Sequence, residues 1–148
     1  MTGNGERVEI LLVEDNPGDV RLIEEAFKEL SITVTLEAVS DGDEGLDFLY
    51  ERVEDAAASV PDFVLLDLNL PRMDGFEFLE AVRNDPDLAR LPVLVLTSSK
   101  ASDDVLESYE LSANAYLTKP TDPDEYASMV QSVAEFWFKR AALPTLSA

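Results

Sequence analysis

Residues 63–75, FVLLDLNLPRMDG, begin as an apolar strand and end on polar and turn-forming residues. Phe63 to Leu66 are all apolar, a pattern typical of a strand that is buried on both of its faces. Asp67 interrupts this run, and Pro71 and Gly75 follow it. The segment therefore predicts a strand that runs through the protein core and ends on a carboxylate.

Four further stretches have the composition of short buried strands, and a helical pattern follows each strand. With the one above, the predicted strands cover residues 8–13, 33–39, 63–66, 92–97 and 115–118. Apolar residues spaced for one helix face predict helices over residues 17–30, 46–53, 76–82, 105–111 and 126–137. Asn16-Pro17 is favoured at a helix start, and Asp41-Gly42 is typical of a turn.

Five βα units in series predict an α/β fold. Strands that are apolar throughout are covered on both faces, which indicates a parallel sheet. Right-handed crossovers place helices on both sides of that sheet, so we expect a doubly wound architecture. The functional site of such a sheet lies beyond the carboxyl ends of its strands. Asp67 is therefore expected at the edge where ligands bind.

The other strands also end on groups that carry chemistry. Glu14 and Asp15 follow the first strand, Thr97 ends the fourth, and Lys119 follows the fifth. The predicted fold thus brings three carboxylates, a hydroxyl and an ammonium together around Asp67.

Three carboxylates at one place repel each other and need compensation. Two unit charges ~4 Å apart interact by about 4 kcal/mol at an effective dielectric of ~20. Lys119 supplies one positive charge, and a divalent cation is the natural source of the rest. An all-oxygen ligand set suits Mg²⁺. A carboxylate beside Mg²⁺ and a lysine is a nucleophile of the aspartyl-phosphate type.

The composition excludes several other kinds of site. The 148 residues are 46% hydrophobic, enough for one domain with a proper core. Cysteine is absent, so disulfides, zinc thiolates and thiol nucleophiles are excluded. Histidine is also absent, which excludes Ser-His-Asp catalysis, histidine metal sites and a phosphohistidine on this chain. No signal peptide or apolar stretch of ~18 residues is present, which predicts a cytoplasmic protein.

The net charge is strongly negative. There are 31 acidic and 11 basic residues, for a formal charge of −20. A field of this sign repels nucleic acids and anionic membranes, so neither is expected as a partner. The acidity fits a generally soluble acidic protein, and it equally fits a halophilic protein from a salt-rich cytoplasm.

Four motifs in order resemble the receiver domain of two-component response regulators. They are ILLVEDNPGDVRLI, FVLLDLNLPRMDGFEFL, VLVLTSS and AYLTKP. The resemblance spans residues 7–138, and it implies a flexible N-terminus over 1–6 and a tail over 139–148. It also implies the flavodoxin-like strand order 2-1-3-4-5. The first motif and the aromatic C-terminal end are similar to stand-alone receivers of the phytochrome-partner type.

The resemblance assigns a role to each candidate residue. Asp67 is implied as the phosphoacceptor, with the histidine of a separate sensor kinase as donor. Mg²⁺ would be held by Glu14, Asp15, Asp67 and the backbone carbonyl of Asn69. Thr97 and Lys119 would each contact a phosphoryl oxygen. Tyr116, with Thr97, matches the aromatic switch, and the Lys119-Pro120 bond would be cis.

The resemblance also predicts the manner of signalling. Few residues follow 138, so we expect a stand-alone receiver without a DNA-binding output domain. Its output would be a phosphorylation-dependent contact with an unknown downstream protein, or a phosphorelay. Such a chain catalyses only its own phosphorylation and dephosphorylation, so we do not expect a conventional enzyme.

The sequence departs from the family pattern at three positions. Ser98 replaces a frequent alanine, Ser112 a usual glycine, and Thr121 a common phenylalanine. None of these changes removes a group that the chemistry needs. They bear on the geometry of the switch and on the lifetime of the phosphoryl group.

Simpler interpretations of the same residues remain open. Asp67 and the Glu14-Asp15 pair could be helix caps or helix-dipole charges, and Lys119 a solvated lysine. Thr97 could be a strand residue only, and Tyr116 a core aromatic.

Two other function classes also remain. An aspartyl phosphohydrolase would need an acid at position 69, where Asn69 cannot transfer protons. A receiver-like binding module would never be phosphorylated.

The C-terminal end carries three consecutive aromatic residues, Phe136, Trp137 and Phe138. One helix face cannot bury all three against its own domain. They either fold back onto the core or form an apolar patch for a partner or a homodimer.

Overall fold

The computed structural model describes residues 7–55, 57–98 and 101–136. Five strands alternate with five helices along the chain. The strands are β1 (Arg7–Val13), β2 (Thr33–Val39), β3 (Phe63–Leu66), β4 (Val93–Thr97) and β5 (Ala115–Thr118). The helices are α1 (Pro17–Lys28), α2 (Gly42–Glu54), α3 (Gly75–Asn84), α4 (Ser102–Glu110) and α5 (Pro123–Val133).

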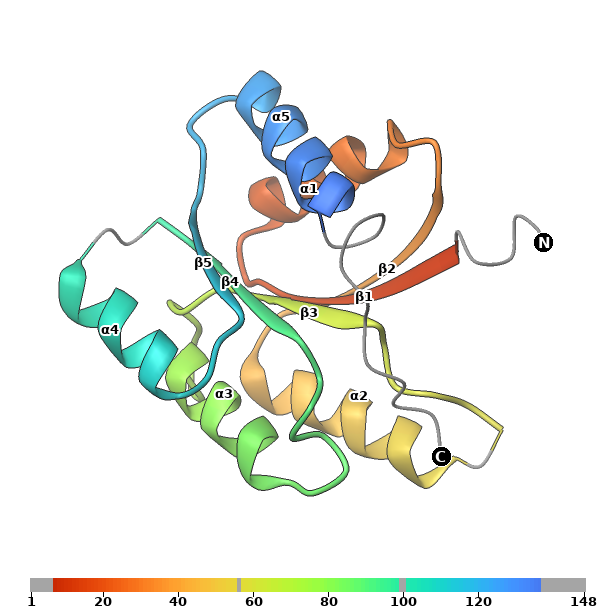
Figure 1. Ribbon diagram of the computed structural model, residues 1–148, viewed down its shortest axis with the longest axis vertical. Helices are drawn as coiled ribbons and strands as arrows, with labels where there is room; N and C mark the ends of the chain where they lie inside the picture. The colour runs from red at the N-terminus through yellow and green to blue at the C-terminus, as the bar shows by residue number, and fades with distance from the viewer. Residues whose placement is uncertain (1–6, 56, 99–100, 137–148) are drawn as a thin grey trace.

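The strands form one parallel sheet in the order β2-β1-β3-β4-β5, as the resemblance implies. Helices α1 and α5 lie on one face of this sheet, and α2, α3 and α4 lie on the other (Figure 1). The doubly wound, flavodoxin-like α/β fold is therefore confirmed. Because every strand runs in the same direction, all carboxyl ends meet at one edge.

Alternating side chains build a core on each face of the sheet. On β3, Val64 and Leu66 join the cluster beneath α2 and α3, whereas Phe63 and Leu65 join the cluster beneath α1 and α5. All four residues are buried. A strand buried on both faces has no solvent side, which explains its unbroken apolar run.

Most predicted elements match the structure closely, and two expectations need correction. Asp41-Gly42 lies at the turn after β2 and already starts α2, because Asp41 caps the helix and Gly42 is its first residue. The Asp41 carboxylate accepts the backbone N–H of Glu44, the bond of an N-cap. The pair thus starts the helix that was predicted to begin at residue 46.

The second correction concerns the bond between Lys119 and Pro120. The described residues contain no cis peptide bond, so this bond is trans. Trans is the lower-energy isomer of an X-Pro bond by about 0.5–1 kcal/mol. The backbone N–H of Lys119 reaches the carbonyl of Thr97 at 2.8 Å in this form. This hydrogen bond keeps Lys119 beside the end of β4.

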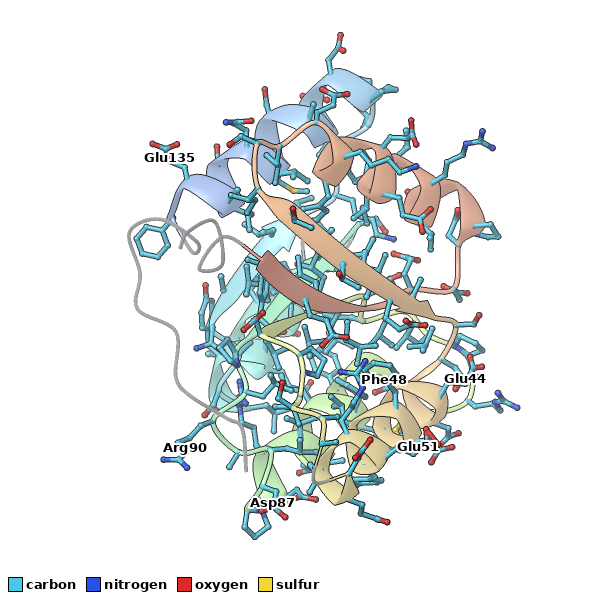
Figure 2. The ribbon with its side chains drawn as sticks, turned by 90° about the vertical axis from the view of Figure 1, so that its right-hand side faces the viewer. Glu44, Phe48, Glu51, Asp87, Arg90 and Glu135 are labelled. Carbon is cyan, nitrogen blue, oxygen red and sulfur yellow. The ribbon has the colours of Figure 1, made fainter. Side chains whose placement is uncertain are left out.

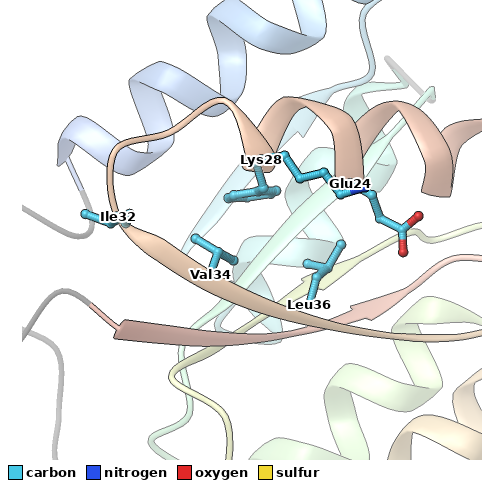
Figure 3. Close-up of a pocket in the computed structure, with 6 residues that line it drawn as sticks. Glu24, Lys28, Ile32, Val34 and Leu36 are labelled. Atoms are coloured by element: carbon cyan, nitrogen blue, oxygen red, sulfur yellow. The ribbon is translucent and has the colours of Figure 1, made fainter. Parts of the chain in front are cut away.

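Strand β2 is at the edge of the sheet, and one groove lies between it and α1. The lining residues are Glu24, Phe27, Lys28, Ile32, Val34 and Leu36 (Figure 3). None of these residues follows the carboxyl end of a strand, so the groove is separate from the predicted site.

The outer surface of the helices is rich in acidic side chains. Glu44 and Glu51 of α2, with Asp87 and Glu135, project outward from the ribbon (Figure 2). None of the helices described is long and apolar enough to cross a membrane.

Candidate functional site

Two neighbouring strands bring the predicted acidic group together. Glu14 follows β1 and Asp67 follows β3, and both side chains are buried, at 3% and 4% exposure. Asp15 is exposed beside them, and carboxylate oxygens of the three residues all lie within 4.8 Å of one another. The structure thus brings the three predicted acids together, and the group is open to solvent on the side of Asp15.

Backbone hydrogen bonds beyond the strands hold the two buried acids in place. The N–H of Asp67 donates to the carbonyl of Val13 at 3.0 Å, and the N–H of Glu14 donates to that of Val39 at 3.0 Å. Each acid thus continues the ladder of its strand by one residue. This explains how two like charges are kept close together despite their repulsion.

Gly75 lets the loop after β3 return tightly to the site. Its N–H donates to the carbonyl of Leu68 at 3.0 Å. A Cβ at this position would lie 2.6 Å from the carbonyl oxygen of Asp67 and 2.6 Å from the Cα of Leu68. Only glycine avoids this clash, so the glycine that ends the opening motif allows α3 to start close against the end of β3.

Lys119 places its ammonium among the carboxylates. Its Nζ lies 2.7 Å from Glu14 and 3.2 Å from Asp67. The lysine side chain is 9% exposed, so these contacts are largely shielded from water. Lys119 is therefore a member of the site and not a solvated surface lysine.

Asp19 is a fourth acid at the site, and sequence reasoning did not include it. It lies in the first turn of α1, and its Oδ2 is 2.9 Å from the Lys119 Nζ. The hydroxyl of Tyr126, on α5, donates to the other Asp19 oxygen at 3.0 Å. An acid in the first turn of a helix is common because of the helix dipole, so the sequence carried no distinctive signal for it.

Burial and charge shift the proton affinities of the site. Burial, with the charge of Asp67, raises the pKa of Glu14 to about 7, although its bond to Lys119 opposes this. Burial also disfavours the Lys119 ammonium, but its bonds to Glu14 and Asp19 outweigh burial and raise the pKa of the lysine. Burial and the bond to Asp19 raise the pKa of the Tyr126 phenol. The lysine is therefore charged at neutral pH.

The remaining predicted residues surround this cluster. Thr97 ends β4 and is fully buried. Because Val95 pairs with Leu66, Thr97 lies near the level of Asp67. The exposed Asn69 donates its backbone N–H to Asp67 Oδ1 at 3.2 Å.

Two further predicted features are the switch residue Tyr116, on the edge strand β5, and the aromatic residues after α5. Tyr116 is half-buried and packs against the cluster beneath α2 and α3. Phe136 is 54% exposed, whereas Trp137 and Phe138 lie outside the described residues, as do the segments 1–6 and 139–148.

The donor set fits a divalent cation by its own chemistry. Glu14, Asp15 and Asp67 offer only oxygen ligands, which suit hard cations such as Mg²⁺. These carboxyl groups share the single positive charge of Lys119, which also pairs with the Asp19 carboxylate. A bound cation would relieve that imbalance.

Comparisons with known proteins give a consistent result. Residues 10–131 match the family model of the response regulator receiver domain. Response regulator Rcp1 of Synechocystis sp. is 44% identical over 135 residues, which cover 91% of this chain and 92% of Rcp1.

Two solved structures are similar over almost their whole length. The Mn²⁺-bound form of Rcp1 has a TM-score of 0.83 and 43% identity, and the match covers 93% of this chain and 99% of that one. The phosphorylated cyanobacterial phytochrome response regulator RcpA has a TM-score of 0.86 and 42% identity, with coverage of 94% and 99%.

Proposed function

This chain belongs to the response regulator receiver domain family, whose members receive a phosphoryl group from histidine kinases, and we propose that Asp67 is its phosphoacceptor. The observation that carries this proposal is the position of Asp67. It is a buried carboxylate at the end of the central strand β3, with an acidic pair on one side and an ammonium 3.2 Å away. Asp67 is the acid around which the other charged groups of the site converge.

In the proposed reaction, a carboxylate oxygen of Asp67 attacks the phosphorus of a phosphohistidine on a sensor kinase. An O–P bond forms while the P–N bond of the donor breaks, and the donor imidazole leaves with the electron pair. The donor histidine lies outside this sequence, which contains none. The Lys119 ammonium already lies beside the Asp67 carboxylate, so it needs no large movement to meet the incoming negative charge.

We assign the metal site to Glu14, Asp15, Asp67 and the backbone carbonyl of Asn69, with Mg²⁺ as the ion. When bound, the ion supplies positive charge that offsets the repulsion between the acids and the phosphoryl group. The geometry of the acidic group and its all-oxygen chemistry support this assignment. The existence of a Mn²⁺-bound form of Rcp1, a similar protein, also supports a divalent cation here.

Thr97 and Tyr116 are the proposed switch. The Thr97 hydroxyl would hydrogen-bond a phosphoryl oxygen, and the ring of Tyr116 would turn inward as that hydroxyl moves. Thr97 is buried at the end of β4, whereas Tyr116 is only half-buried on the neighbouring strand. The register of β4 and β5, which pairs Val95 with Tyr116, supports coupling between the two.

Signalling is proposed to occur through a protein contact or a phosphorelay. The match to Rcp1 covers most of both chains, which supports a stand-alone receiver that acts without an attached DNA-binding domain. The cognate kinase is a sensor histidine kinase, and the likeness to RcpA favours one of the phytochrome class. We place the protein in the cytoplasm, and its charge of −20 favours a cytoplasm rich in salt.

Phosphoryl transfer from acetyl phosphate tests the main assignment. The parent protein should form an acid-stable, hydroxylamine-sensitive acyl phosphate when Mg²⁺ is present, and Asp67→Asn should form none. Asp87→Asn is the matched control, since it removes one exposed carboxylate away from the site (Figure 2). Labelling that persists in Asp67→Asn would refute the assignment. Binding of Mg²⁺ without phosphoryl uptake from any donor would instead favour a receiver-like binding module.

We also propose that the aromatic residues 136–138 form a contact in a homodimer or with a partner. The exposure of Phe136 next to the end of α5 supports this. Sedimentation of the parent and of Trp137→Ala tests the homodimer. A dimer that dissociates in the variant supports the contact, and a monomer for both proteins rejects the homodimer.

A further inference from the structure

Asp19 and Tyr126 form a small network with the site lysine. Asp19 accepts from Lys119 with one carboxylate oxygen and from the Tyr126 hydroxyl with the other. The tyrosine side chain is 1% exposed, and that of the aspartate is 23% exposed. The network therefore lies on the face of the sheet that α1 and α5 cover (Figure 1), and the packing of these two helices fixes its geometry.

Asp19 differs from the other two carboxylates that contact the lysine. Glu14 and Asp67 belong to the acidic group that is assigned to the metal, and Asp67 also has to react. Asp19 does not belong to that group, and both of its oxygens already have a donor. The bond between Asp19 and Lys119 therefore does not depend on whether a metal ion occupies the acidic group.

We propose that Asp19, held by the Tyr126 hydroxyl, is a positioning residue that fixes the Lys119 ammonium beside the acceptor carboxylate. This inference rests on the proposed function of Asp67 and adds to it the residues that orient the lysine.

The flexibility of a lysine side chain explains why such a residue is useful. An ammonium has three N–H donors at the end of a long flexible chain, and ordering that chain costs conformational entropy. If Asp19 orders it beforehand, the cost does not add to the barrier when the donor arrives. The contact of the ammonium with Asp19, at 2.9 Å, lies between those with Glu14 at 2.7 Å and Asp67 at 3.2 Å, and Asp19 is the partner of these three outside the acidic group.

Tyr126 has a separate part in this arrangement. A carboxylate with one bonded oxygen can rotate, whereas a second bond from a buried hydroxyl fixes its orientation. Because Tyr126 belongs to α5 and Asp19 to α1, the packing between these helices determines where the lysine points.

Two variants and two matched controls test the proposal. Asp19→Asn keeps the size of the side chain but removes its charge, and Tyr126→Phe removes only the hydroxyl. Asp124→Asn, on the exposed surface of α5, removes the same charge away from the lysine. Tyr50→Phe removes the same hydroxyl from an exposed position on α2. Urea unfolding confirms that each variant is folded.

The first measurement is the rate of phosphoryl uptake from acetyl phosphate at saturating Mg²⁺. We expect a decrease of about tenfold for Asp19→Asn and a smaller decrease for Tyr126→Phe, because the lysine is misplaced and not lost. Both controls should react at the parent rate. The Mg²⁺ concentration at half-maximal rate should stay the same in all variants, since Asp19 is outside the acidic group.

The second measurement is the ¹⁵N resonance of the Lys119 ammonium, with and without Mg²⁺. A held ammonium exchanges slowly and gives a resolved signal, which should broaden or vanish in Asp19→Asn under both conditions. If Asp19 had only a structural role, Asp19→Asn would lower the free energy of unfolding and leave this signal intact. A parent-like rate or a parent-like signal in Asp19→Asn overturns the proposal. If the parent itself took up no phosphoryl group, the assignment of Asp67 would fail, and the ammonium signal alone would decide the role of Asp19.

Discussion

Helices α1 and α4 each follow a strand that ends at the site, yet they are built differently. In α1, the side chain of Asn16 caps the start, Lys28 lies in the last turn, and three residues are buried. In α4, Ala101 provides no side-chain cap, the last turn has no basic residue, and only Ser108 is buried. The half of the site that holds charge is therefore attached to a well-anchored helix, and the half that contains the proposed switch residues, Thr97 and Tyr116, lies beside a weakly anchored one.

This difference corresponds to what each half has to do. The Lys119 ammonium must stay in place to react, and it is bound to Asp19 of α1, which Tyr126 of α5 holds in turn. A switch must instead change its conformation at a small cost, and such elements come from the less stable parts of a fold. The exposed Leu106 and Tyr109 show how little of α4 is committed to the core.

The largest expected difference between the two helices is in the free energy of unfolding lost when a side chain is truncated, because their side chains are buried to different extents. Ile23→Ala on α1 should lower the free energy of unfolding by about 2–5 kcal/mol, because it leaves a cavity in a fully buried position. Leu106→Ala on α4 should lower it by less than about 0.5 kcal/mol, since that side chain is 60% exposed. Urea unfolding measures both values. Similar losses for the two variants would remove the basis of the comparison.

The α1 side of the site should also make stability depend on pH. Burial raises the pKa of Glu14 from 4.5 to about 7, so folding favours the protonated form. The metal-free protein should therefore lose stability as the pH rises from about 4.5 to about 7, with a slope of at most about 1.4 kcal/mol per pH unit. Glu14→Gln should be less pH-dependent than the parent across that window. Parallel curves for the two proteins, measured by urea unfolding in a chelator, would contradict this prediction.

The fold could be predicted because its strands leave a clear signal, an unbroken apolar run in the buried β3 and an alternating pattern in the edge strand β2. Strands β2, β3 and β5 have the bounds expected from the sequence. Since all strands end at one edge, Glu14, Asp67 and Lys119 could be placed together from the strand ends alone. Their contacts at 2.7 and 3.2 Å follow from that topology.

The missed features depend on tertiary contacts that leave no local pattern. Asp19 resembled an ordinary first-turn acid, and Tyr126 resembled one of several apolar positions on a helix face. Only the packing of α1 against α5 brings the two side chains together. The trans Lys119–Pro120 bond is a similar case, because the sequence is compatible with both isomers.

Changes at the helix caps should alter the stability of α1 and α4 in opposite directions. Asn16→Ala removes the bond to the Asp19 N–H and should destabilise the protein by about 1 kcal/mol. Ala101→Asn places a capping side chain at the start of α4, where the backbone is already extended, and should stabilise it by up to about 1 kcal/mol. Amide hydrogen exchange should slow in α4 of the second variant and quicken in α1 of the first. Faster exchange in the parent α1 than in the parent α4 would contradict the proposed contrast.

The smallest expected effect comes from charges in the last turn of each helix. The carbonyl end of a helix favours a cation, so Glu110→Lys on α4 should stabilise the protein by about 0.3–1 kcal/mol at low salt. Lys28→Glu on α1 should destabilise it by a similar amount, and this change also removes an exposed ion pair with Glu25. Both effects should shrink in about 1 M KCl, where the screening length falls to about 3 Å.

The parent, with its charge of −20, should itself become more stable over the same range of salt. Added salt would then weaken the unfavourable interaction of Glu110 with the carbonyl end of α4, which Glu110→Lys removes at low ionic strength. If the effect of Glu110→Lys persisted undiminished at high salt, packing and not charge would account for it. The weak anchoring of α4 would then have to be attributed to its few buried side chains alone.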